Sequence, residues 1–247
     1  FFSIFFATIM PAHSTLKIDI TSGNTDPLPI ALPDLAGSSV GRDIIQVISA
    51  DLERSGLFKP LPQNAYIEQI TLQTGIPRYA DWRQINASAL VTGSAITEGD
   101  KLRVSFRLWD VLGEEQMAGK EYNTFKNNWR RIAHIMADEI YKRMTGENGY
   151  FDSRIVYVAE SGPDLKRVKR LAIMDQDGEN HKFLTDGRFL VLTPRFSPNS
   201  QEILYMSYAG KQPRVFLRDL QTGREESLGT FQGMSFAPRF ANDGNSI

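Results

Sequence analysis

The residues most suggestive of chemistry are 37–41, which read Gly-Ser-Ser-Val-Gly and match the Gly-x-Ser-x-Gly pattern of a serine-hydrolase nucleophile elbow. An elbow needs a hydrophobic strand that runs straight into its first glycine, and a Pro-Asp pair interrupts any such strand here. After the first fourteen residues the histidines are His134 and His181, which no common sheet brings together. Because serine favours helix N-termini, we predict that Ser38 or Ser39 caps a helix and that there is no catalytic residue.

Two carboxylate patterns could hold a metal ion. His134 and Asp138 are spaced i, i+4, but nothing nearby supplies further ligands, so we predict a pair on a helix surface. Residues 175–178 read Asp-Gln-Asp-Gly, like the start of a calcium loop, yet the third acidic position and the distal glutamate are missing. We interpret this Asp-Gly as a hairpin turn and predict no metal site and no cofactor.

Charge and cysteine content exclude several classes of function. The net charge is −1, and the one basic cluster, residues 166–170, is surrounded by acidic residues without an aromatic platform. We therefore predict no nucleic-acid partner, and we find no pattern for a small-molecule substrate. The chain has no cysteine, which removes disulfides, thiolate metal sites and cysteine nucleophiles.

An internal repeat organises the C-terminal part of the chain. Pro-Arg-Phe occurs at residues 194–196 and again 44 residues later at 238–240, a spacing typical of one four-stranded propeller blade. Short apolar stretches follow the first copy and predict strands at residues 203–208, 214–220 and 226–228. Residues 154–160 align with 202–208, so we expect the repeats to begin near Phe151 and a third blade to open with the second copy.

The first ten residues form an uncharged apolar run, too short to span a membrane and followed by Ala-His-Ser at 12–14. We interpret residues 1–14 as the remnant of a signal peptide that is cleaved after Ser14. The alternative is a buried N-terminal strand. A signal peptide predicts export, and the absence of cysteine leaves the compartment open.

Residues 15–148 predict an α/β domain. Residues 16–20 alternate between apolar and polar side chains, as an edge strand does. The prolines of 29–33 predict a second strand at a sheet edge. A helix follows whose apolar face ends before Arg54 and Gly56; its members are Ile44, Ile45, Val47, Ile48 and Leu52. We expect a second edge element at 66–70 and a short helical turn at 79–85.

The rest of this domain has clearer periods. Residues 89–97 and 101–110 predict a hairpin around a Glu-Gly-Asp turn, and 116–125 predict another strand. Residues 127–144 carry apolar side chains at i, i+3 and i+4, with Gly146 beyond, and predict the closing helix. Residues 145–150 would link this domain to the repeats at 149–247.

Five separated stretches, in order, resemble the TolB family: residues 51–58, 86–93, 137–146, 154–158 and the Pro-Arg-Phe-Ser-Pro repeat. The resemblance implies an α/β N-terminal domain followed by an all-β propeller of six blades. This chain would then hold strands of the first blade, all of the second and the opening of the third, an incomplete propeller.

The resemblance also implies a function. It implies a non-enzymatic, protein-binding scaffold of the Tol-Pal system in the periplasm, which supports outer-membrane integrity and envelope constriction in cell division. The propeller would bind the lipoprotein Pal and the mature N-terminal segment would bind TolA. The residues expected to contact TolA are Leu16, Lys17, Ile18, Asp19 and Ile20.

Two alternatives stay open. The N-terminal segment 15–22 is either a fixed edge strand of the domain or a segment that exchanges between a docked and a partner-bound state. The chain as a whole could instead belong to a propeller-gated serine hydrolase, whose catalytic domain would lie beyond Ile247. A second α/β domain there would favour the enzyme, and further blades would favour the scaffold.

Overall fold

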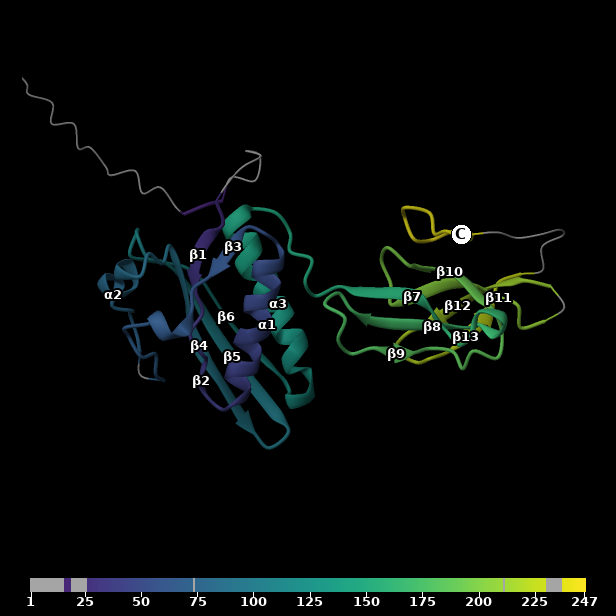
Figure 1. Ribbon diagram of the computed structural model, residues 1–247, viewed down its shortest axis with the longest axis horizontal. Helices are drawn as coiled ribbons and strands as arrows, with labels where there is room; N and C mark the ends of the chain where they lie inside the picture. Colours follow the sequence, from purple (N-terminus) through teal and green to yellow (C-terminus); the bar gives the residue numbers. More distant parts are fainter. Residues whose placement is uncertain (1–15, 19–25, 73, 211, 230–236) are drawn as a thin grey trace, which may run out of the picture. The chain divides into compact units, whose positions relative to one another are not determined.

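The computed structural model describes residues 16–18, 26–72, 74–210, 212–229 and 237–247. These residues form two units that divide between Asp152 and Ser153, and each unit is described by itself (Figure 1). The first unit contains a mixed sheet with helices, and the second contains only strands and short turns. The chain is therefore an α/β domain followed by part of a β-propeller, as the sequence predicts.

The sheet of the first unit runs in the order β3-β1-β4-β5-β6, and β2 also pairs with β4. Parallel pairing joins β1 to β3 and β4, whereas β4, β5 and β6 form an antiparallel meander. The strands are β1 (Leu28–Ala31), β2 (Ala36–Gly37), β3 (Phe58–Pro60), β4 (Ala89–Glu98), β5 (Lys101–Asp110) and β6 (Glu115–Phe125). The predicted hairpin and the strand after it are thus confirmed.

Helices α1 (Val40–Arg54) and α3 (Trp129–Thr145) lie side by side on one face of this sheet (Figure 1). Their apolar stripes and the inner face of the sheet form one buried core, which includes Ile48, Val104 and Ile140. The opposite face is covered only in part, by residues of 61–72 and 74–88, which include helix α2 (Tyr79–Gln84) and the short 3₁₀ turn Gln63–Ala65. A second 3₁₀ turn, Lys126–Asn128, precedes α3.

Glycine allows β4 and β5 to approach closely in the middle of the sheet. A Cβ at Gly93 would lie 2.0 Å from the carbonyl oxygen of Ser105 on the neighbouring strand. Only a residue without a side chain fits there.

The prediction that 29–33 lies at a sheet edge is wrong, because β1 is an inner strand. In a parallel sheet the backbone N–H and C=O groups of successive residues point alternately to the two neighbouring strands. The N–H of Leu28 donates to the carbonyl of Leu57, on the β3 side. Pro29 therefore faces β4, where its carbonyl accepts the N–H of Ser88 at 2.9 Å. Ser88 precedes the first residue of β4. The N–H that Pro29 lacks would therefore point to a part of the chain where β4 has not yet begun.

Other expectations about the first unit are corrected. Residues 66–70 form no strand, because they pack on Trp82 and Trp109 through Tyr66 and Ile70 instead of pairing with the sheet. Residues 16–18 have no strand assignment either. The predicted helical turn at 79–85 is confirmed as α2.

The second unit holds two antiparallel sheets. The first sheet has three strands: β7 (Arg154–Ser161), β8 (Val168–Asp175) and β9 (Lys182–Phe183), with a 3₁₀ turn at Asp164–Lys166. The second sheet is a four-stranded blade in sequential order: β10 (Val191–Phe196), β11 (Glu202–Ser207), β12 (Arg214–Asp219) and β13 (Glu225–Ser227). Residues buried between them include Leu171, Val191, Ile203 and Tyr205.

The two copies of the repeat share backbone geometry. Thr193 and Ala237, 44 residues apart, both have positive φ, 51° and 41°. The Ser197 N–H donates to the Glu202 carbonyl at 2.9 Å, and the equivalent Ala241 N–H donates to Ser246 at 2.8 Å. Residues 237–247 nevertheless contain no strand, so the expected first strand of a third blade is not seen there.

Candidate functional site

The described part of the predicted partner-binding segment, residues 16–18, lies against the C-terminal end of α3. Ile18 is buried in the main core, Leu16 packs against that core, and Lys17 is exposed. The N–H of Ile18 donates to the carbonyl oxygen of Met144 at 2.7 Å. Asp19 and Ile20, the other residues of the predicted segment, lie outside the described residues.

The end of α3 explains why this contact forms. The last four carbonyls of a helix have no partner within it, and Met144 is the penultimate residue of α3. Gly146, with φ of 85°, ends the helix and returns its N–H to the Lys142 carbonyl at 2.9 Å. The segment supplies a donor for Met144. Among the described residues, the segment is therefore held by this backbone hydrogen bond, by the burial of Ile18 and by the packing of Leu16 on the core.

Six residues before Met144, α3 holds the residues that leave the first unit. Both oxygens of Asp138 accept backbone N–H groups, from Phe151 at 2.7 Å and from Asp152 at 3.1 Å. A Cβ at Gly149 would lie 2.2 Å from Asp138 Oδ1, so this approach requires glycine. Burial raises the pKa of Asp138 above its usual value, although the two N–H donors oppose that shift.

The predicted helix-surface pair of His134 and Asp138 is wrong. His134 is 2% exposed, and its Nδ1 lies 2.6 Å from Oδ2 of Asp51, a fully buried residue of α1. Arg54 contacts the other oxygen of Asp51 at 3.2 Å. Asp51 follows Ile44 and Ile48 on the apolar stripe of α1, and an acidic residue in that position is the signal that predicts a buried partner.

The serines of the Gly-x-Ser-x-Gly pattern have structural contacts. Ser39 occupies the N-cap position of α1, but its side chain makes no capping hydrogen bond, so the predicted cap is correct in position and wrong in chemistry. The hydroxyl of Ser38 donates instead to the Ala95 carbonyl at 2.8 Å, which ties the loop to β4. Gly37, with φ of 113°, lies against that same carbonyl.

The remaining predicted sites are turns and ion pairs in the second unit. The N–H of Gly178 donates to the Asp175 carbonyl at 3.0 Å, which confirms a hairpin turn. In the basic cluster, Arg167 and Lys169 lie 3.6 and 3.7 Å from the carboxylate of Glu160 on the neighbouring strand. Within the described ranges, no helix has the length and apolar character that a membrane crossing requires.

Comparisons with known proteins agree with these two units. The TolB amino-terminal domain family matches residues 16–117, and the TolB beta propeller domain family matches residues 141–247. The chain is 56% identical over 237 residues to the Tol-Pal system protein TolB of Paramagnetospirillum magneticum, a match that covers 93% of this chain and 53% of that protein.

A solved structure shows the same fold. The crystal structure of TolB from Acinetobacter baumannii matches with a TM-score of 0.77 at 28% identity, over 89% of this chain and 54% of that one. The chain thus spans about half the length of the relatives it matches. An amino-terminal domain and a propeller region in the same order, with this identity to a curated relative, show that the chain belongs to the TolB family.

Proposed function

We propose that this chain is a component of the Tol-Pal system that acts in the periplasm as a non-enzymatic, protein-binding scaffold. The relative with 56% identity is named as the TolB protein of that system, and both TolB domain families match the chain. The serines of the hydrolase-like pattern support this proposal, because Ser38 is engaged with a backbone carbonyl of β4. In this role the protein supports outer-membrane integrity and envelope constriction during division.

The proposed partners are TolA and Pal. Residues 16–20 bind TolA, and the propeller, of which this chain contains one complete four-stranded blade, binds Pal. The observation that carries the TolA proposal is the small contact of residues 16–18 with the first unit, which among the described residues consists of one backbone hydrogen bond of 2.7 Å, the buried Ile18 and the partly buried Leu16. Burying an isoleucine contributes about 1.5–3 kcal/mol and a hydrogen bond about 0.5–1.5 kcal/mol.

A hold of that size allows exchange between two states. In the docked state the Ile18 N–H donates to the Met144 carbonyl of α3. In the released state the backbone of the segment is free to add to the sheet of a partner. A partner that pairs with several residues of the segment gains more hydrogen bonds than the one that residues 16–18 lose on release. The segment then contributes both to the closed domain and to the complex, one at a time.

Deletion of residues 15–22 tests this proposal. The full-length protein without them should lose capture of the C-terminal domain of TolA and keep its capture of Pal. A synthetic peptide of residues 15–22 should compete for TolA, and a peptide with the same composition in scrambled order is the matched control. Unchanged TolA capture after the deletion would contradict the proposal, and loss of folding would assign the segment a purely structural role.

A further inference from the structure

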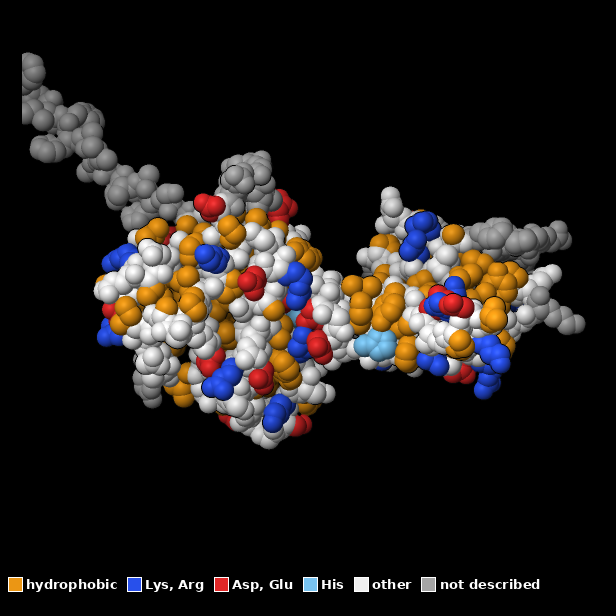
Figure 2. All heavy atoms as spheres, viewed as in Figure 1, with side chains coloured by type: hydrophobic (Ala, Val, Ile, Leu, Met, Phe, Trp, Pro, Cys, Tyr) orange, Lys and Arg blue, Asp and Glu red, His pale blue; other side chains and the backbone are white. Residues whose placement is uncertain are grey.

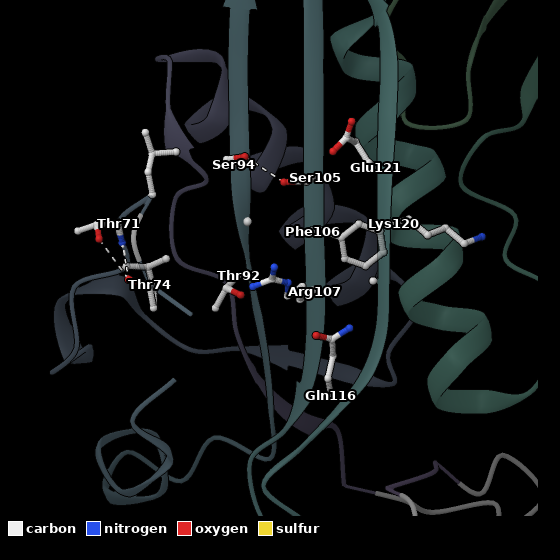
Figure 3. A pocket seen from close by; sticks show the side chains of 14 residues that line it. Thr71, Thr74, Thr92, Ser94, Ser105, Phe106, Arg107, Gln116, Lys120 and Glu121 are labelled. Atoms are coloured by element: carbon white, nitrogen blue, oxygen red, sulfur yellow. Dashed lines mark hydrogen bonds between the residues drawn. The ribbon is translucent and has the colours of Figure 1, made fainter. Parts of the chain in front are cut away.

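The face of the first-unit sheet opposite α1 and α3 contains a polar groove. Outward side chains on β4 and β5 form successive pairs: Leu90 with Trp109, Thr92 with Arg107, Ser94 with Ser105, and Ile96 with Arg103. On β6, Gly119, Glu121 and Asn123 continue the last three pairs across the sheet. A cleft of about 430 Å³ lies over these rows, with the loop of Thr71 and Thr74 as one wall (Figure 3).

The groove is closed at one end and open at the other. Leu90 and Trp109 are buried under residues of the segment 61–88, so on β4 and β5 the row of Thr92 and Arg107 is the last one that a ligand can reach. In the opposite direction a second hollow, of about 330 Å³, continues along the same strands past Ile96 to Phe125, which is 57% exposed. A chain that enters along the strands must therefore stop at Arg107.

Hydrogen-bond donors gather at the closed end. The guanidinium of Arg107 makes no hydrogen bond or ion pair with any residue that the structure describes. Thr92 Oγ1 accepts the indole N–H of Trp109 at 2.8 Å, which leaves the hydroxyl proton of Thr92 available. The side-chain amide of Gln116 lies over Gly119, where a Cβ would be 2.9 Å from Nε2 (Figure 3). Donors of three kinds suit a carboxylate.

The next row supplies acceptors. Glu121 lies opposite Ser105, whose hydroxyl is 2.9 Å from that of Ser94 (Figure 3). Glu121 accepts a hydrogen bond from the Asn123 amide at 3.4 Å and has no ion pair among the described residues. Lys120 does not compete for it, because its ammonium lies 2.5 Å from Glu139 on α3. Rows two residues apart are about 7 Å from each other, the repeat of an extended peptide. The donors at Arg107 thus match the carboxylate of an extended peptide. The acceptors one row away match a backbone N–H of the same peptide.

We propose that this groove binds the C-terminal tail of an extended peptide, with its terminal carboxylate on Arg107. The backbone N–H of the second residue before the carboxylate meets Glu121. A side chain about four residues from the end reaches the apolar surface of Ile96 and Phe125. The blind end at Trp109 selects a chain terminus over an acidic side chain in mid-chain, because a chain that continued would collide with residues 61–88.

Tryptophan indole signals provide the test. Trp109 reports on Thr92, whereas Trp82, whose indole N–H donates to Glu68 at 2.7 Å, reports on the integrity of the fold. The ¹⁵N-labelled full chain is titrated with acetyl-Leu-Ala-Ala-Ala as the free acid. Parallel titrations use the same peptide as its C-terminal amide and an amidated peptide with an internal aspartate. The free acid should shift the Trp109 signal, and the amide should bind at least ~10-fold more weakly.

Variants assign the effect to the groove. Arg107→Gln should weaken the free acid to the level of the amide, with the Trp82 signal unchanged. Arg42→Gln is the matched control, since it removes a positive charge from α1, on the other face of the sheet and outside the groove, and it should change the affinity less than about twofold. Equal binding of acid and amide, binding of the internal aspartate as tight as the free acid, or an unmoved Trp109 signal would each overturn the proposal.

Discussion

The two units of this chain bury their apolar side chains in different ways. In the first unit, at least 26 buried residues, most of them from the sheet, α1 and α3, form one continuous cluster. Among the described residues of the second unit, the cluster between the two sheets has four buried members, Leu171, Val191, Ile203 and Tyr205, and its other members are partly buried. Figure 2 shows apolar side chains on the surface of the second unit as well.

The difference indicates what specifies each unit. Helices packed side by side on a sheet can bury polar side chains completely, and in the first unit Asp51 and His134 are buried in this way. Stacked blades bury little per repeat and rely on turns that recur at a fixed spacing, such as those closed by Ser197 and Ala241. We therefore expect the first unit to be sensitive to core chemistry and the second to turn geometry.

The largest effect should come from the buried pair in the first unit. His134→Ala leaves the Asp51 carboxylate buried without the imidazole 2.6 Å away, and should lower the free energy of unfolding by about 3–5 kcal/mol. Urea unfolding followed by tryptophan fluorescence measures this, because Trp82, Trp109 and Trp129 all lie in the first unit. Arg42→Ala, which breaks an exposed pair with Asp34, is the control and should cost less than about 1 kcal/mol.

Equivalent isoleucines sharpen the comparison. Ile48 and Ile203 are both 0% exposed, one in each unit. Ile48→Ala should cost about 4–5 kcal/mol, and Ile203→Ala about 2–3 kcal/mol, because half-buried neighbours such as Val156 and Phe216 can move into the space. Hydrogen exchange of each unit's strand amides gives both values in one protein. Equal costs would show that the second core is as rigid as the first.

A smaller effect should come from breaking the hydrogen bond between the two repeat turns. The side-chain amide of Asn199 donates to the Asp243 carbonyl at 2.9 Å, and these two positions are equivalent in successive copies of the repeat. Asn199→Ala should cost about 0.5–1.5 kcal/mol and speed amide exchange at Ala241, with no change in the first unit. Unaltered exchange at Ala241 would mean that the second turn is stable without its neighbour.

The smallest effect concerns alkaline pH. Burial, with the charge of Glu139 as a lesser cause, raises the pKa of Tyr122 from 10.0 to about 12. The unfolded tyrosine ionises first, so the stability due to the neutral phenol is present below pH 10 and is lost between about pH 10 and 12. The hydroxyl has no hydrogen-bond partner among the described residues, so Tyr122→Phe should be near neutral at pH 7. That variant should flatten the alkaline decline seen by tryptophan fluorescence, and an unchanged slope would contradict this assignment.

Local patterns predicted most elements of both units. The helices at Val40–Arg54 and Trp129–Thr145 follow from apolar side chains at helical spacing, and the hairpin of β4 and β5 follows from alternation around a glycine turn. The 44-residue repeat predicted the four-stranded blade, and the order of motifs predicted the family. The helix and hairpin patterns depend on neighbours within a few residues, and the repeat appears when the sequence is compared with itself, so the sequence displays both directly.

Tertiary structure alone decided the contacts between distant residues. Asp51 and His134 are 83 residues apart, and only the packing of α1 on α3 brings them together. Pro29 reads as an edge residue, yet it lies in an inner strand because β4 begins only after Ser88. The groove at Arg107 likewise exists because residues 61–88 cover one end of a sheet face and leave the other open. These arrangements depend on how the helices, the sheet and the loops pack on one another, and no local sequence pattern shows that packing.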